Sequence, residues 1–312
     1  MQDPGNIIIA GANKCGTTSL FRYLSAHPRV TGSSVKEAGF FWHQRDFSSP
    51  AAVTAYRELF GSSPSADTVF LEATPNYLDG GSRIATAIKS VLQDPRLIFL
   101  FRDPVDRLVS YYRSKSGFKH APTFGMEFRE FTDIATYSIS KEPSELSLRD
   151  QHLRHEVAKG LYADRLKQYL SIFPSSSMLI LFYDDLASDT AGTTKKAARF
   201  AGLDPDFFDD FDFSVENRSR AHRSASLRTW ASLANRRMEP VLNRAPAMRR
   251  WARALYNALN TTGKGGVDPD SGALDDLRRV YAGPNEQFAA LLQGSFSVND
   301  FPSWLRSTST SN

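Results

Sequence analysis

A glycine- and threonine-rich turn near the start of the chain has the composition of a phosphate site. Residues 11–18 read Gly-Ala-Asn-Lys-Cys-Gly-Thr-Thr; they follow an apolar run, Asn6–Ala10, and open a helical pattern. At such a turn, free backbone N–H groups and the helix dipole converge on an anion. The spacing approaches the nucleoside-triphosphate loop G-x-x-x-x-G-K-[ST], but Lys14 precedes the second glycine and Thr17 follows it. The turn therefore predicts a phosphate site and disfavours an ordinary ATPase or kinase, and a turn without chemical function is the alternative.

A second pattern follows another apolar run, Leu97–Phe101. It reads Arg-Asp-Pro-Val-Asp-Arg-Leu-Val-Ser-Tyr-Tyr and begins at Arg102. Asp103 can cap a helix here, and Pro104 suits its first turn because the missing N–H costs nothing there. A planar guanidinium such as Arg102 can make charge-assisted, bidentate hydrogen bonds to a phosphate. Taken singly, Arg102 and Ser110 are more safely interpreted as a strand-end arginine and a polar helix residue.

Alternating strands and helices must position these two patterns. Such alternation is typical of a parallel sheet covered by helices. We therefore expect an α/β fold: a single domain with a parallel central sheet, a P-loop-like phosphate-binding loop and helices on both faces. The expected strands are Asn6–Ala10, Val69–Glu72, Leu97–Phe101 and Met178–Phe182, and the expected helices include Thr17–Ala26, Gly81–Leu92 and Pro104–Ser116.

Together the two patterns resemble the signatures of the sulfotransferases that use 3′-phosphoadenosine 5′-phosphosulfate (PAPS). The run from Lys14 to Leu20, followed by Leu24 and His27-Pro28, is similar to the family's 5′-phosphosulfate loop, K-x-G-T-[ST]-x-L followed by L-x-x-H-P. The run from Arg102 is similar to the second signature, R-[DN]-P-x-x-R-x-x-S-x-[YF]. The resemblance implies one sulfotransferase domain over residues 1–306. It also implies in-line transfer of the sulfuryl group from PAPS to an acceptor hydroxyl or amine, without a metal, leaving 3′,5′-phosphoadenosine.

The resemblance also implies roles for individual residues. Lys14 would contact the bridging oxygen and the 5′-phosphosulfate, where an ammonium can neutralise the charge that grows on the leaving oxygen. Arg107, one helical turn before Ser110, is open to a structural role as an ion-pair partner. The 5′-phosphate would be bound by Gly16, Thr17 and Thr18, and the 3′-phosphate by Arg102 and Ser110.

The segment Val35–Trp42 looks like the K-E-x-x-[FY]-F segment of the heparan-sulfate branch of this family and its bacterial relatives. In that branch the glutamate is the proposed general base. Glu37 is therefore our catalytic candidate, because an acceptor hydroxyl has to lose its proton as it attacks sulfur. The alternative for Glu37 is a solvated carboxylate that pairs with Lys36 or Arg45.

Comparison with two branches of the family leaves the identity of the catalytic residues open. The segment Leu71–Leu78 resembles the E-K-[ST]-P-x-Y strand end of the same branch, but Ala73 stands where the animal enzymes carry a lysine. That leaves Lys14, helped by Lys36, to stabilise the developing charge. The aryl and steroid sulfotransferases use a histidine base instead, and His43 and His120 are the candidates for that role, although a lone histidine is more often a surface or packing residue.

A strongly basic segment follows residue 217. Residues 217–266 contain ten arginines and one lysine against a single acid, Glu239. Arg218 and Arg220 resemble the K-G-R loop that closes over the 3′-phosphate in this family, so we expect them to bind the cofactor. Residues 224–266 are expected to be helical and to form a lid or acceptor-cleft element. Their apolar face either packs on the core with the arginines in water or makes peripheral contact with an anionic membrane.

Composition sets the remaining expectations. With one cysteine in 312 residues and no leader-like start, we expect a cytoplasmic protein without an internal disulfide. The tail, residues 307–312, is expected to be disordered. From the resemblance we expect the acceptor to be a carbohydrate, glycolipid or small metabolite, with no nucleic acid involved. The acceptor's identity and the oligomeric state stay open. The alternatives are an ATP-dependent kinase with a degenerate phosphate loop and an inactive nucleotide- or lipid-binding adaptor.

Overall fold

The computed structural model describes residues 5–44, 46–47, 49–61, 67–213, 221–222, 261–262, 269–296, 298 and 300–306. The chain divides into two compact units. The first comprises residues 1–108, 155–217 and 276–312, and the second comprises residues 109–154 and 218–275. Arg218, Arg220, nearly all of the basic segment 224–266 and the tail 307–312 lie outside the described residues. The roles expected of those residues stay predictions.

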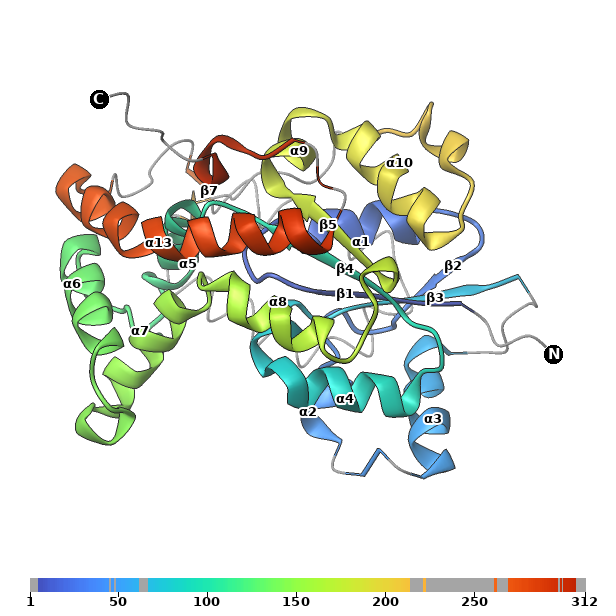
Figure 1. Cartoon of the computed structure of the whole chain (residues 1–312), viewed down its shortest axis with the longest axis horizontal. Coiled ribbons are helices and arrows are strands. Elements are labelled where there is room, and N and C mark those ends of the chain that lie inside the picture. Colours follow the sequence, from blue (N-terminus) through green and yellow to red (C-terminus); the bar gives the residue numbers. More distant parts are fainter. Residues whose placement is uncertain are drawn as a thin grey trace. The chain divides into compact units, whose positions relative to one another are not determined.

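The first unit is built on a five-stranded parallel sheet with the strand order β2-β3-β1-β4-β5 (Figure 1). Strands of a parallel sheet are covered on both faces, and the interiors of the central strands are accordingly apolar and almost fully buried, with the charged residue Glu72 as an exception. This confirms the predicted α/β fold. The strands are β1 (Gly5–Gly11), β2 (Val30–Gly32), β3 (Val69–Ala73), β4 (Arg96–Phe101) and β5 (Met178–Phe182).

Helices cover both faces of this sheet. Helices α1 and α10 pack together on one face, and α4 and α8 pack together on the other (Figure 1). None of the described helices is long and apolar enough to cross a membrane. The helices that lie wholly in this unit are α1 (Thr17–Ser25), α2 (Phe40–His43), α3 (Pro50–Arg57), α4 (Gly81–Val91), α8 (Tyr162–Leu170), α9 (Tyr183–Ser188) and α10 (Thr190–Ala201), with short 3-10 helices at Glu58–Phe60 (η1), Pro75–Gly80 (η2), Ser175–Ser177 (η4), Pro205–Phe208 (η5) and Ser303–Leu305 (η6).

Three helices continue from one unit into the other: α5 (Pro104–Lys115), α7 (Leu148–Ala158) and α13 (Ser271–Ser295). The start of α5 is the predicted one, because Oδ1 of Asp103 accepts a hydrogen bond from the N–H of Val105 at 2.7 Å. Helix α13 contains Pro284 and continues through it.

The second unit is mainly helical in its described part. Its core is aromatic: the rings of Tyr112 and Phe131 stack at 5.7 Å, and the hydroxyl of Tyr112 donates to the carbonyl of Met126 at 2.7 Å. The unit contains α6 (Phe128–Ile139), a 3-10 helix at Pro143–Glu145 (η3) and a two-residue antiparallel ladder of β6 (Ala221–His222) with β7 (Thr261–Thr262).

Candidate functional site

The predicted phosphate loop joins the end of β1 to the start of α1. Two hydrogen bonds fix it: the N–H of Ala12 donates to the carbonyl of Leu100 on β4 at 2.7 Å, and Nδ2 of Asn13 donates to Oδ1 of Asn76 on η2 at 3.2 Å. Lys14 is half-buried and has a left-handed backbone with φ of 68°. The turn is therefore tied to the carboxyl ends of two neighbouring strands, where open α/β sheets bind their ligands.

Gly16 is required by this loop for two reasons. Its φ is +87°, a region that residues with a Cβ rarely adopt. A Cβ at this position would also lie 2.9 Å from Cδ2 of Leu186 and 3.0 Å from Cδ2 of Tyr183. Beyond it, the first turn of α1 carries no acidic residue, with Thr17 buried and Thr18 exposed. An anion at this helix start would meet free N–H groups and no opposing carboxylate from that turn.

Arg102 follows β4 directly. Its guanidinium lies 4.4 Å from the centre of the Tyr183 ring, and Nη2 lies 3.6 Å from Oδ2 of Asp106. Its Nε is buried and has no hydrogen-bond partner among the described residues. Tyr183 therefore contacts the guanidinium and also lies against Gly16, which joins the two predicted signatures at one place. The sequence did not single out Tyr183, although its position directly after β5 was an available signal.

The other residues of the second signature have separate environments. Ser110 belongs to the second unit and is a partly exposed residue of α5. Its predicted role at the 3′-phosphate stays a prediction. Arg107 is fully buried in the first unit, with Nη1 3.7 Å from Oε2 of Glu156, and its Nη2 donates to the carbonyl of the same residue. Arg107 is thus the structural ion-pair partner, one of the readings the sequence allowed.

Cys15 lies inside the phosphate loop and is fully buried. Its Sγ is 3.5 Å from the carbonyl of Asn13. Burial raises the pKa of the thiol to about 11, although Arg107 and Arg102 act in the opposite direction. The thiol is therefore neutral at physiological pH and fills space beneath the loop.

Glu37 is held beside the same edge of the sheet. Its N–H donates to the carbonyl of Ala73, the last residue of β3, at 2.9 Å, and its backbone is left-handed with φ of 61°. Its carboxylate is half-exposed, and Oε1 lies 2.5 Å from Nζ of Lys36. This ion pair is the one named in the alternative interpretation, and it also places a second lysine beside the candidate base. His43 ends α2 and is exposed, and His120 is an exposed residue of the second unit.

A buried carboxylate lies on β3, one residue before Ala73, whose carbonyl binds the N–H of Glu37. Glu72 has no exposed surface, and its Oε1 accepts hydrogen bonds from the hydroxyls of Thr74 at 2.8 Å and Tyr77 at 2.7 Å. Burial raises its pKa to about 7, although both hydrogen bonds act to lower it. Sequence reasoning saw this glutamate only as one letter of a motif. A charged residue inside an otherwise apolar strand was the signal that pointed to it.

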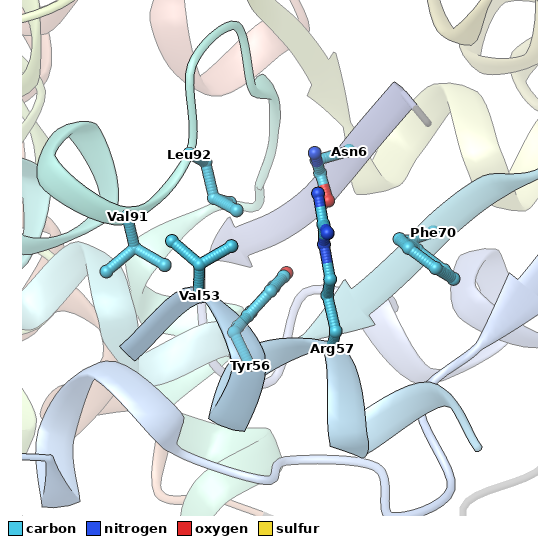
Figure 2. A pocket seen from close by; sticks show the side chains of 7 residues that line it. All are labelled: Asn6, Val53, Tyr56, Arg57, Phe70, Val91 and Leu92. Carbon is cyan, nitrogen blue, oxygen red and sulfur yellow. The ribbon is translucent and has the colours of Figure 1, made fainter. Parts of the chain in front are cut away.

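A small pocket lies at the opposite edge of the sheet (Figure 2). Asn6 and Phe70 near the amino ends of β1 and β3 line it, together with residues of α3 and the end of α4 (Figure 2). Its lining contains none of the predicted site residues. We therefore place the candidate site at the carboxyl edge and not in this pocket. The complete lining is Asn6, Val53, Tyr56, Arg57, Phe70, Val91 and Leu92.

Comparison with known proteins gives relatives of similar sequence. A bifunctional heparan sulfate N-deacetylase/N-sulfotransferase 2 from Bos taurus is 27% identical over 202 residues, which cover 64% of this chain and 22% of the relative. A heparan sulfate glucosamine 3-O-sulfotransferase 3B1 from Mus musculus is 31% identical over 198 residues, which cover 63% of this chain and 45% of the relative. The chain thus spans less than half the length of these two relatives.

A structural match and a family match accompany these two relatives. A solved sulfotransferase from Alicyclobacillus acidocaldarius matches with a TM-score of 0.61 at 21% identity, and the match covers 97% of this chain and 100% of that one. Residues 4–220 match the sulfotransferase domain family. This range includes the phosphate loop, Glu37, the Arg102 signature and strand β5. The chain therefore belongs to the sulfotransferase family.

Proposed function

We propose that this chain transfers the sulfuryl group of PAPS to a hydroxyl or amine of an acceptor. The observation that carries the proposal is the meeting of the two signatures at Tyr183. There a glycine turn and an arginine whose buried Nε has no hydrogen-bond partner in the described part of the chain lie against the same aromatic ring. A nucleotide with phosphates on both its 5′ and 3′ sides requires two such groups close together. The residues present therefore fit PAPS.

Each residue has a defined task in this proposal. PAPS supplies an activated sulfuryl group whose leaving group is a phosphate. The N–H groups at the start of α1, with Thr17 and Thr18, hold the 5′-phosphate, and Arg102 holds the 3′-phosphate. Lys14 stabilises the negative charge on the departing oxygen. Glu37 accepts the proton of the acceptor group, and being half-exposed it can be reached by an acceptor from solvent.

The names of the two relatives support one class of acceptor. Both are named for heparan sulfate, so we propose a carbohydrate acceptor, free or in a glycolipid, ahead of a small metabolite. The cytoplasmic location and the cofactor roles of Ser110, Arg218 and Arg220 stay predictions. Membrane contact through residues 224–266 also stays a prediction.

Incubation with sulfur-labelled PAPS and fractionated cell extract tests the proposal. We expect label in a carbohydrate or glycolipid fraction with the wild type. With Lys14→Ala we expect at least about a hundredfold less, because one donor to a developing anion contributes that much to the rate. The variant should still bind 3′,5′-phosphoadenosine. Absence of label from every fraction, or equal labelling by the variant, would contradict the proposal.

A further inference from the structure

The backbone around Glu37 adopts an unfavourable conformation that must be held by something outside it. Glu37 has φ of 61° and Gly39 has φ of 65°, so two left-handed residues flank Ala38. For a residue with a Cβ this region is disfavoured, and such conformations persist only where the surroundings impose them. The candidate base therefore depends on its contacts with the rest of the first unit.

Two hydroxyl groups supply those contacts. The N–H of Gly39 donates to Oγ1 of Thr74, and the N–H of Phe41 donates to the hydroxyl oxygen of Tyr77, both at 3.2 Å. The backbone N–H of Glu37 is itself bound to the end of β3 at 2.9 Å. The turn is thus attached at three alternate residues, 37, 39 and 41.

The same two hydroxyls converge on one buried oxygen. Thr74 and Tyr77 both donate to Oε1 of Glu72, at 2.8 Å and 2.7 Å. A hydroxyl can point its proton in several directions, whereas Oε1 of Glu72 only accepts, both in the carboxylate and in the neutral acid that carries its proton on Oε2. With both protons directed at Glu72, the lone pairs of the two oxygens face the N–H groups of Gly39 and Phe41. The Glu72 carboxyl group therefore orients the two hydroxyl oxygens that accept hydrogen bonds from the turn. It does so through Thr74 and Tyr77, without itself binding the turn.

We propose that Glu72 is a positioning residue which, through the hydroxyls of Thr74 and Tyr77, holds the turn at residues 37–41 and so fixes the carboxylate of Glu37 for proton acceptance. The catalytic part of this inference rests on the proposed function. The attachment of the turn does not, because it is a property of the fold alone. A rigid support of this kind matters because a small displacement of a reacting group costs much of its effect on the rate.

Three variants of the hydroxyls test the relay. Thr74→Val keeps the shape of the side chain and removes its hydroxyl, Tyr77→Phe does the same at the second position, and Thr74→Ser restores a hydroxyl. Tyr281→Phe is the matched control, since it removes a buried tyrosine hydroxyl that donates to the carbonyl of Val157 at 2.8 Å. Two quantities are measured for each: amide hydrogen exchange at Gly39 and Phe41, and kcat beside the affinity for 3′,5′-phosphoadenosine.

We expect exchange to quicken by about fivefold to tenfold at Gly39 in Thr74→Val and at Phe41 in Tyr77→Phe, the usual worth of one hydrogen bond. We expect kcat to fall by about tenfold in both variants while cofactor affinity changes less than about twofold. Thr74→Ser should return to near the wild type, and the control should change neither quantity.

Several outcomes would overturn the inference. Unchanged exchange at both amides removes the relay, whatever the activity. Faster exchange with an unchanged kcat removes the positioning role, and it leaves the proposed function intact if Glu37→Gln is inactive in the same assay. A fall in kcat that Thr74→Ser does not restore points to loss of packing and also refutes it. A wild type that transfers no sulfate refutes the proposed function and the catalytic part together, while the exchange data still decide the attachment.

Discussion

Replacing Glu72 with glutamine should change how the stability of the fold depends on pH. The folded-state pKa of Glu72 is about 7, against 4.5 for the ordinary carboxyl. Because the folded state holds this proton more tightly than the unfolded state, the side chain contributes most stability at low pH. That contribution is lost as the pH rises through about 7. A raised carboxyl pKa makes stability fall as the pH rises, whereas the lowered pKa of a typical ion-paired aspartate or glutamate makes stability rise with pH.

The size of the effect follows from the same shift. Linkage with these two pKa values gives a loss on the order of 2 to 3 kcal/mol between pH 5 and pH 8. Glu72→Gln cannot titrate and keeps an oxygen that can accept from Thr74 and Tyr77. The free energy of unfolding of the variant, minus that of the wild type, should therefore rise by roughly 2 to 3 kcal/mol over this range. Asp79, whose pKa burial raises to about 6, is present in both proteins and cancels in the difference.

Urea denaturation followed by tryptophan fluorescence, at intervals from pH 5 to pH 8, measures this difference. The absolute stability of the variant depends also on the new amide N–H groups, which replace an oxygen that has no hydrogen-bond partner among the described residues. The change of this difference with pH does not depend on those amide groups, because an amide does not titrate in this range. A difference that stays constant with pH, or that falls as the pH rises, would refute the assignment of a raised pKa to Glu72.

Three further predictions concern the phosphate loop and its neighbours. Gly16→Ala should weaken binding of 3′,5′-phosphoadenosine by at least about tenfold in calorimetry, since its Cβ would lie 2.9 Å from Leu186 and its φ is +87°. Arg102→Lys should lose about tenfold in affinity for 3′,5′-phosphoadenosine but little for ADP, which lacks the 3′-phosphate, and an equal loss for both would count against a 3′-phosphate site. Cys15 should react with iodoacetamide at pH 8 about a hundredfold more slowly in the folded protein than after denaturation, as its pKa of about 11 implies, and rapid labelling seen by mass spectrometry would disprove its burial.

The parts of the fold that sequence predicted well are those whose signal is local. Strands β1, β4 and β5 are continuous apolar runs, and the helix after β4 begins at a visible cap, Asp103, so their positions could be read from composition and spacing. The edge strand β2 and helix α2 could not. Strand β2 has three partly buried residues and helix α2 has four residues. Both are too short to show the alternation of a strand or the repeat of a helix in their apolar residues.

The site divides in the same way. Gly16 and Arg102 belong to contiguous motifs with their own spacing and were identified. Tyr183 and Glu72 act through contacts between segments far apart in the sequence, Gly16 with Tyr183 and the Glu37 turn with Glu72 through intervening hydroxyls. Such contacts depend on which strands are neighbours in the sheet. A single sequence without the strand order does not contain that information.

The most direct test of the central claim is donor identity. The wild type, Glu37→Gln and Lys14→Ala are each given the carbohydrate fraction as acceptor, with either sulfur-labelled PAPS and a chelator or γ-phosphate-labelled ATP and Mg²⁺. We predict transfer of the sulfur label alone, slowed by about a hundredfold or more when Glu37 can no longer accept a proton. Transfer of the phosphate label instead, or an undiminished rate of sulfur transfer in both variants, would contradict the account.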